Sequence, residues 1–341
     1  MPPVRPRVTP VGKSPLFLRV LYYARKAAAC AVLVLLLGET GSGKEDVARF
    51  IHQESCVQGE FLAVNCGAFQ DTNLEVELFG SEKGAFTSAE SKAGLVEAAA
   101  DGTLFLDEVG EMSPAMQVKL LRLLQSQEYR RVGGLHNRKA RCRIIAATHR
   151  DLCEMVNLGT FREDLFYRLC IMPIVIPPLR ERPEDIVVLA VALLERARGS
   201  KGQPRLVLEP AVLDWMALQP WPGNVRQLGS FIELAAVLSD SGRITMGVVE
   251  EAHTLRSRVG TPGGTRAPAA TTTAPLVLTP EVIPVRDQIL AALAKAEALR
   301  EIDIARACGV ARPAIRRPLD GLVSEGLVEK LPGRRGYRRR G

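Results

Sequence analysis

The chain has 341 residues, enough for two or three domains of roughly 100–200 residues each. Its composition, 47% hydrophobic and 24% charged with a net charge of +7, is typical of folded protein and not of disorder or fibres. The longest apolar run, Ala27 to Leu37, is too short to span a bilayer, and the seven cysteines form no CxxC pair, so we expect no membrane segment, no zinc ribbon and a reduced, cytoplasmic setting.

The N-terminal segment divides into an arm and a helix. Residues 1–11 are rich in proline and show no periodicity, so we expect a disordered arm. Apolar residues then recur at helical spacing through residues 12–29, which predicts an entry helix with Leu16, Val20, Leu21 and Ala24 facing inward.

Five short apolar runs follow, and each is typical of a strand buried on both faces of a parallel sheet. Helical patterns lie between them, for example at residues 116–125. Strands that alternate with helices predict an α/β fold with a parallel sheet. The runs are residues 32–37, 61–64, 103–106, 144–148 and 174–176.

After Pro178 the strand patterns stop. Three helical patterns predict a small all-helical lid, at residues 183–198, 209–218 and 224–239. Residues 260–280 are rich in Thr, Ala, Pro and Gly and predict a flexible linker.

The first apolar run leads directly into a GxxxxGK motif, a phosphate-binding loop. Its glycines let backbone N–H groups turn toward phosphates, the next helix offers its positive end, and the lysine reaches the terminal phosphates. The motif usually continues with Ser or Thr as a Mg²⁺ ligand, but here Glu45 follows. The nucleotide-binding residues expected from it are Gly38, Glu39, Thr40, Gly41, Ser42, Gly43 and Lys44.

A second acidic motif ends the run at 103–106. Asp107 is placed to hold Mg²⁺, and Glu108 is placed to polarise the water that attacks ATP. Two carboxylates at a strand end could also be a solvated surface feature. The phosphate loop upstream favours the catalytic interpretation.

These residues occur together in one family. Residues 38–228 resemble the central AAA+ domain of sigma-54-dependent transcriptional activators, the bacterial enhancer-binding proteins, in which Glu is usual at the position of Glu45. Further segments match in the family's order: 63–66, 77–80, 82–87, 131–134, 144–148, 161–169, 177–182 and 221–228.

The resemblance implies an ATP-hydrolysing ring, usually a hexamer, with each site completed by its neighbour. It implies that Asn65 restrains the catalytic Glu and that Thr148 is the first sensor, although His149 stands where the family usually has Asn. It also implies that Arg226 is the second sensor.

Two arginines resemble those that the family offers in trans to the neighbour's γ-phosphate. They are Arg162 and Arg168, and such arginines typically raise the rate by about 10³–10⁵. Without the family, a surface ion pair with Glu163 or Asp164 would be the simpler interpretation of both arginines.

The family's signature loop, GAFTGA, contacts sigma-54. Here the loop reads GAFTSA, with the contact pair Phe86 and Thr87 kept and Ser88 in place of glycine. If that position needs a positive φ, Ser costs on the order of 1 kcal/mol. The expected contact residues are Gly84, Ala85, Phe86, Thr87, Ser88 and Ala89.

Residues 300–341 hold eleven basic and five acidic residues, an excess of six that is nearly the whole net charge. Helical patterns at 287–296, 302–308 and 311–325, followed by a basic hairpin, resemble the winged helix-turn-helix of many bacterial repressors. A DNA duplex is the expected partner, and a protein-binding winged helix is the alternative. Pro318 would kink the third helix. The expected DNA-contacting residues are Arg312, Arg316, Arg317, Arg334 and Arg335.

The sequence therefore predicts an α/β AAA+ phosphate-loop domain with a helical lid and a C-terminal winged helix-turn-helix. We expect an ATPase that uses Mg²⁺ and opens sigma-54 RNA polymerase promoters, controlled by a separate inhibitory protein or by its expression level. The alternative is a DNA-binding regulator independent of sigma-54, in which ATP controls assembly; a metabolic phosphate-loop kinase fits poorly. The expected parts are 1–11 (arm), 12–178 (α/β), 179–259 (lid), 260–280 (linker) and 281–341 (winged helix-turn-helix).

Overall fold

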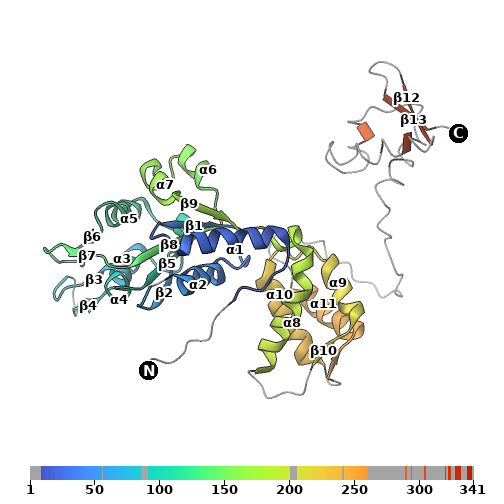
Figure 1. The fold of residues 1–341 in the computed structure, drawn as a ribbon, viewed down its shortest axis with the longest axis horizontal. Coiled ribbons are helices and arrows are strands. Elements are labelled where there is room, and N and C mark those ends of the chain that lie inside the picture. The colour runs from blue at the N-terminus through green and yellow to red at the C-terminus, as the bar shows by residue number, and fades with distance from the viewer. Residues whose placement is uncertain are drawn as a thin grey trace. The chain divides into compact units, whose positions relative to one another are not determined.

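The computed structural model describes the first part of the chain almost continuously and the C-terminal part at short stretches. The chain divides into two compact units, Met1–Gly264 and Thr265–Gly341 (Figure 1). The described residues are 9–55, 57–85, 91–199, 206–239, 242–259, 289, 293, 303–304, 319, 322–323, 327–331 and 336–339.

The core of the first unit is a five-stranded sheet with the order β2-β5-β8-β1-β9 (Figure 1). Every neighbouring pair is parallel, which confirms the α/β prediction. Because all strands run the same way, their carboxyl ends meet at one edge of the sheet. The strands are β1 (Val34–Leu37), β2 (Phe61–Asn65), β5 (Thr103–Asp107), β8 (Arg143–Thr148) and β9 (Met172–Val175).

Helices cover both faces of this sheet. Successive side chains of a strand enter opposite faces, so Leu35 packs in one hydrophobic core and Val34 and Leu36 pack in the other. The core of Val34 and Leu36 is closed by α1 (Pro15–Ala28) and α2 (Lys44–Glu54). The core of Leu35 is closed by α3 (Asp71–Phe79), α4 (Leu95–Ala98), α5 (Pro114–Ser126), α6 (Leu152–Asn157) and α7 (Glu163–Leu169).

The prediction that each strand is buried on both faces is confirmed for the three inner strands, β5, β8 and β1. It is wrong for the two edge strands, β2 and β9. In β2 Ala63 is exposed, and in β9 Val175 is 66% exposed. An edge strand has only one neighbour, so part of its surface remains open to solvent.

Helix α1 confirms the entry helix, with one correction. It begins at Ser14, whose hydroxyl accepts a hydrogen bond from the Phe17 N–H (3.2 Å). Val20, Leu21 and Ala24 are buried as expected, but Leu16 is 44% exposed. Leu16 lies at the margin of the buried face of the helix, and its neighbour Phe17 is buried instead.

Two antiparallel strand pairs carry the loops beyond α3 and α5. A bridge between Ser81 and Val132 joins them, and Arg131 contacts Glu97 (2.8 Å) and Glu82 (3.4 Å) across them. The chain between β3 and β4 holds the loop 84–89. The pairs are β3 (Gly80–Ser81) with β4 (Lys92–Ala93) and β6 (Glu128–Tyr129) with β7 (Arg138–Lys139).

The lid has more elements than the sequence predicted. The three expected helices are present, but a fourth helix and a pair of two-residue parallel strands accompany them, so the all-helical expectation is wrong. Two-residue strands are too short for any periodicity to show in the sequence. The elements are α8 (Pro183–Gly199), β10 (Val207–Leu208), α9 (Pro210–Leu218), α10 (Asn224–Leu238), β11 (Arg243–Ile244) and α11 (Met246–Val259).

The second unit is built on a small hydrophobic core. Ile289, Leu293, Ile304, Leu319 and Leu322 are buried and helical, as three packed helices require. The expected wing is present as an antiparallel hairpin of β12 (Val328–Leu331) and β13 (Gly336–Arg339).

Across the ranges that the structure describes, no helix combines the length and apolarity needed to cross a bilayer. The described cysteines are free thiols: Cys30, Cys66, Cys142, Cys153 and Cys170.

Candidate functional site

The phosphate loop connects β1 to α2 at the carboxyl edge of the sheet. Gly41 and Gly43 have φ of +75° and +103°, which glycine adopts without strain. A β-carbon at Gly41 would also lie 2.5 Å from the Gly223 carbonyl oxygen. Helix α2 begins at Lys44, so its first N–H groups have no partner inside the helix and can bind an anion.

Lys44 is folded against this loop. Its Nζ donates to the carbonyl oxygens of Gly38 (3.0 Å) and Glu39 (3.4 Å) and lies 3.6 Å from Oε1 of Glu108. Only 6% of Lys44 is exposed. A cation so enclosed is stabilised by these partners and is available to a phosphate that enters the loop.

Asp107 and Glu108 end β5 beside the loop, as expected. Burial and the charge of Glu108 raise the pKa of Asp107. Burial also acts to raise the pKa of Glu108, but hydrogen bonds from His149 and the charge of Lys44 outweigh it, so that pKa is lowered. Glu108 has φ of 55°, a conformation that costs a non-glycine residue energy and is often found at functional sites.

Asn65 ends β2 and Thr148 ends β8, the two strands that flank β5. Asn65 pairs in register with Asp107, and its side-chain oxygen accepts from the Gly67 N–H (2.9 Å). Thr148 is fully buried, and its carbonyl oxygen accepts from the Gly38 N–H (3.3 Å). The sheet therefore brings both residues to the edge that holds the phosphate loop.

His149 makes a short contact with Glu108. Its Nδ1 lies 2.6 Å from Oε2 of Glu108, and its backbone N–H donates to the same oxygen (3.2 Å). The sequence marks His149 only as a departure from the family's Asn. The contact spans 41 residues, and only the pairing of β5 beside β8 brings the two residues together.

The lid is bonded directly to the phosphate loop. Arg180 donates to both oxygens of Glu39 (2.7 and 2.8 Å), and the Asn224 amide donates to Glu39 and to the Thr40 carbonyl oxygen (both 3.1 Å). The hydrogen bonds from Arg180 lower the pKa of Glu39. Sequence reasoning missed Arg180 and Asn224, although both lie in the matching segments 177–182 and 221–228.

Arg226 lies on α10 against the same loop. Its backbone N–H is 3.4 Å from the Gly41 carbonyl oxygen, and its side chain is exposed. Arg226 therefore lies next to the phosphate loop, and its role as the second sensor stays a prediction.

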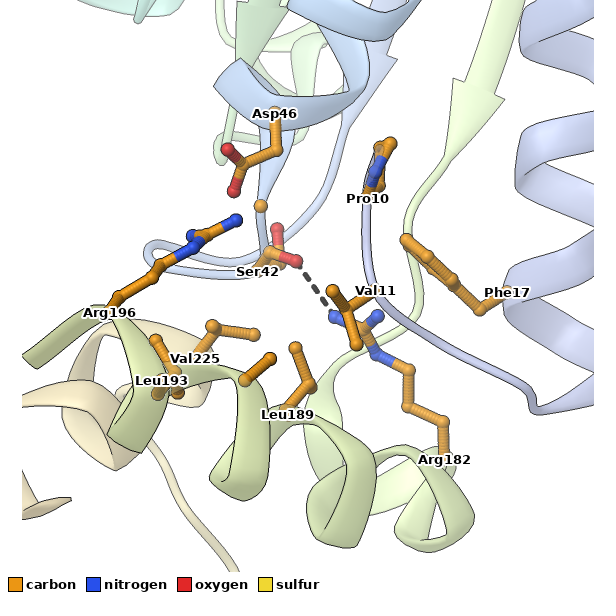
Figure 2. A pocket seen from close by; sticks show the side chains of 12 residues that line it. Pro10, Val11, Phe17, Ser42, Asp46, Arg182, Leu189, Leu193, Arg196 and Val225 are labelled. Atoms are coloured by element: carbon orange, nitrogen blue, oxygen red, sulfur yellow. Dashed lines mark hydrogen bonds between the residues drawn. The ribbon is translucent and has the colours of Figure 1, made fainter. Parts of the chain in front are cut away.

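A cavity of about 40 Å³ lies beside the loop, where the N-terminal segment meets the lid (Figure 2). Arg182 donates to the Ser42 carbonyl oxygen there (2.8 Å). The Ser42 hydroxyl and Arg182 Nε are buried and have no hydrogen-bond partner among the described residues. Burial raises the pKa of Asp46 at the cavity wall. A ligand that carries hydrogen-bonding groups could pair with the Ser42 hydroxyl and Arg182 Nε.

The donor set fits a magnesium ion bound together with phosphates. Asp107 supplies a carboxylate next to a second one, and a divalent cation would relieve their repulsion. Glu45 instead binds Arg49 (2.6 Å) and is exposed. No group of three metal-ligating side chains occurs in the described ranges, so phosphate and water would complete the shell.

Of the two expected trans arginines, Arg162 is the N-cap of α7 and Arg168 lies in its last turn. Arg162 binds both oxygens of Asp164 (2.6 and 3.0 Å), and Arg168 donates to the Leu124 carbonyl oxygen (2.8 Å). Within one chain Arg162 therefore makes the surface ion pair that the sequence offered as the simpler alternative.

Parts of two predicted interfaces lie outside the described residues. Of the loop 84–89, Gly84 and Ala85 are described, with φ of +84° at Gly84. Outside the described residues lie Phe86, Thr87, Ser88, Ala89, Arg312, Arg316, Arg317, Arg334, Arg335 and Pro318.

Three families match successive parts of the chain. Residues 11–175 match the sigma-54 interaction domain, residues 180–262 match the AAA+ ATPase lid domain, and residues 288–332 match the IclR helix-turn-helix domain. The third match agrees with the winged helix-turn-helix prediction, since that domain is a winged one.

Curated relatives are similar over the same region. The Nif-specific regulatory protein of Azotobacter vinelandii is 48% identical over 241 residues, 70% of this chain and 46% of that protein. The regulatory protein AtoC of Escherichia coli is 46% identical over 228 residues, 66% of this chain and 50% of that protein. The chain thus spans about half the length of these relatives.

Solved structures of NtrX from Brucella abortus have a similar fold. The complex with ADP has a TM-score of 0.66 at 28% identity, covering 93% of this chain and 69% of that one. The complex with ATP has a TM-score of 0.65 at 29% identity, covering 92% and 69%.

Proposed function

Residues 11–175 of the chain belong to the sigma-54 interaction domain family and residues 180–262 form an AAA+ ATPase lid domain, and we propose that this module hydrolyses ATP to open sigma-54 promoter complexes. One observation supports this most directly. Lys44 and Glu108 lie 3.6 Å apart beside a phosphate loop shaped by Gly41 and Gly43. A phosphate-binding cation next to an ionised carboxylate is the arrangement that phosphoryl transfer to water requires.

The proposed roles follow from the contacts. The N–H groups of the loop and of the first turn of α2 bind the phosphates, and Lys44 exchanges Glu108 for phosphate oxygens. Asp107 would hold Mg²⁺, which neutralises charge on the phosphates when bound. Glu108, kept ionised, orients the attacking water.

The base of the nucleotide would lie beside the loop, near the small cavity that Ser42 and Arg182 line. Both residues have a buried polar atom without a hydrogen-bond partner among the described residues. NtrX bound to ADP and to ATP is a structural relative, which supports a nucleotide as the ligand here.

We propose that a second copy of the chain completes each site, in a ring of six copies. Arg162 and Arg168 would act on the neighbour's γ-phosphate. Because Arg162 is bound to Asp164 in the single chain, it must change partners on assembly.

The other parts have separate proposed roles. Residues 84–89 would contact sigma-54 from the hairpin β3–β4, and residues 281–341 would bind DNA through the helix that holds Arg312, Arg316 and Arg317 and through the basic wing. Residues 260–280 would act as the linker between the two.

The test is binding of the purified chain to sigma-54 with ATP and with an ADP–metal-fluoride mimic of the transition state. We expect mimic-dependent binding that Phe86→Ala abolishes, together with ATP hydrolysis by both proteins. An ATPase that binds no sigma-54 would contradict the proposal.

A second candidate is a DNA-binding regulator independent of sigma-54, in which ATP controls assembly. Ser88 in place of the family's glycine favours it. Ser88→Gly separates the two candidates. If the unaltered chain hardly binds sigma-54 and Ser88→Gly binds it much more strongly, the natural loop is impaired. Strong binding of sigma-54 by the unaltered chain would exclude the second candidate.

A further inference from the structure

The carboxylate of Glu108 is held from two sides by different groups. On Oε1 the partner is Lys44, whose Nζ is 3.6 Å away. On Oε2 the partners are the Nδ1 (2.6 Å) and the backbone N–H (3.2 Å) of His149. The side chain of Glu108 is only 14% exposed, so water replaces these partners poorly.

Asn65 makes no comparable contact. Its side-chain oxygen accepts from the Gly67 N–H, and no hydrogen bond joins it to Glu108 among the described residues. The residue expected from the family resemblance to restrain Glu108 is therefore engaged with its own loop.

The direction of the His149 hydrogen bond follows from the charge of Glu108. The other two groups on this carboxylate, Lys44 Nζ and the backbone N–H of His149, can only donate, and a carboxylate that is held by such donors can only accept. Nδ1 of His149 must then carry the hydrogen. Charge-assisted hydrogen bonds of this kind are short and about twice as strong as neutral ones.

The backbone that carries His149 is also anchored. The next residue, Arg150, donates to both oxygens of Glu111 (2.6 Å each), which lies in the turn η1 (Val109–Glu111) directly after Glu108. The backbone N–H of Arg150 donates to the hydroxyl of the buried Thr148 (3.1 Å). The end of β8 is thus bonded to the segment that follows β5 directly beside the His149–Glu108 contact.

We propose that His149 is a positioning residue that fixes the direction of the Glu108 carboxylate, and that it alone does so once Lys44 has turned to the phosphates. This inference rests on the proposed ATPase function. It assigns to His149 a role that the family resemblance gives to Asn65.

Loss of this contact should slow the turnover of ATP and leave the binding of nucleotide unchanged. Nucleotide binding depends on the loop and Lys44, which His149 does not touch through any hydrogen bond in the described structure. Misplacing a catalytic group by about 1 Å can cost about 100-fold in rate. Loss of the imidazole should therefore lower kcat and leave the KM for ATP and the affinity for ADP unchanged.

The experiment compares two substitutions at one position in the full chain. His149→Ala removes the donor, and His149→Asn places an amide nitrogen on Cγ, where Nδ1 is attached in His. His136→Ala is the matched control, because His136 is an exposed histidine in a distant loop.

We expect His149→Ala to lower kcat by about 10- to 100-fold with KM within about twofold of the unaltered chain. We expect His149→Asn to stay within about threefold in kcat, and His136→Ala to show no change. An unchanged kcat in His149→Ala, or an equal loss in His149→Asn, would overturn the inference.

A second measurement needs no turnover. The chain has four histidines, so ¹⁵N-labelled imidazoles can be assigned by substitution. We expect a protonated Nδ1 signal from His149 that shifts in Glu108→Ala; a signal unaffected by that change would refute the contact. If the unaltered chain hydrolyses no ATP but this signal behaves as expected, the failure lies in the proposed function and the contact stands.

Discussion

At the scale of single residues, Glu108 is the most sharply tested position. Glu108→Gln keeps the shape of the side chain but removes the charge that orients water. We expect kcat to fall by about 10²–10⁴-fold while ADP still binds. Phosphate release and ADP titration measure the two quantities, and Glu54→Gln, a carboxylate at the far end of α2, is the control. Equal losses of binding and turnover would mean that Glu108 only maintains the shape of the site.

Single residues also show where sequence reasoning was sufficient. Lys44, Asp107 and Glu108 were predicted from short motifs because each motif is local and its geometry follows from a strand, a tight turn and a helix. The partner of Glu108 could not be predicted in this way, since a histidine 41 residues away carries no signal of its own.

At the scale of elements, one buried carboxylate ties α1 to α8. Asp185 is fully buried and accepts from the N–H groups of Lys13 (2.6 Å) and Ser14 (2.7 Å) and from the Ser14 hydroxyl (2.8 Å), with Arg182 3.8 Å away. Asp185→Ala would leave these donors without their acceptor and would remove the carboxylate that faces the buried guanidinium of Arg182. We expect a loss of about 3–5 kcal/mol in the free energy of unfolding, measured with urea.

The matched control for Asp185 is an exposed pair. Glu54 lies 3.8 Å from Arg25 at the surface, and Glu54→Ala should change the free energy of unfolding by less than about 0.5 kcal/mol. Similar losses in the two variants would show that the Asp185 contacts add nothing beyond an ordinary surface pair.

The contact between η2 (Leu179–Glu181) and the phosphate loop should depend on pH. The pKa of Glu39 is lowered by Arg180, so the pair stabilises the fold above the usual pKa of 4.5, and this contribution is lost as pH falls through the lowered value. Because both side chains are largely exposed, we expect Arg180→Ala to cost only about 0.2–1 kcal/mol at pH 7.

Urea unfolding of Arg180→Ala and of the unaltered chain from pH 7 to pH 3 tests this. The difference in the free energy of unfolding between the two proteins should shrink as the pH falls through the lowered pKa of Glu39. A difference that is constant with pH would assign the effect of Arg180 to packing.

At the scale of the whole molecule, the basic excess lies in the second unit. If the wing contacts DNA phosphates, each arginine there releases about one counterion on binding. We expect the double substitution Arg334→Ala and Arg335→Ala to reduce the slope of log Kd against log salt by about 2 on a 20-base-pair duplex. An unchanged slope would favour the protein-binding interpretation of the winged helix.

The sequence by itself determined the order of the parts and their chemistry. Apolar runs, glycines before a lysine and paired carboxylates are local features, and each predicts a strand, a phosphate loop or a strand end without knowledge of the rest. The parallel sheet follows from their alternation with helices, and every neighbouring pair of strands in the five-stranded sheet is parallel.

Only the tertiary structure decided which side chains meet at that edge. The contacts of His149 with Glu108, of Arg180 with Glu39 and of Asp185 with the start of α1 span 41, 141 and about 171 residues along the chain. No local pattern encodes such pairs, because a polar side chain looks the same in a sequence whether it faces water or a distant partner. The packing of the sheet and the lid brings them together, and burial makes the contacts strong.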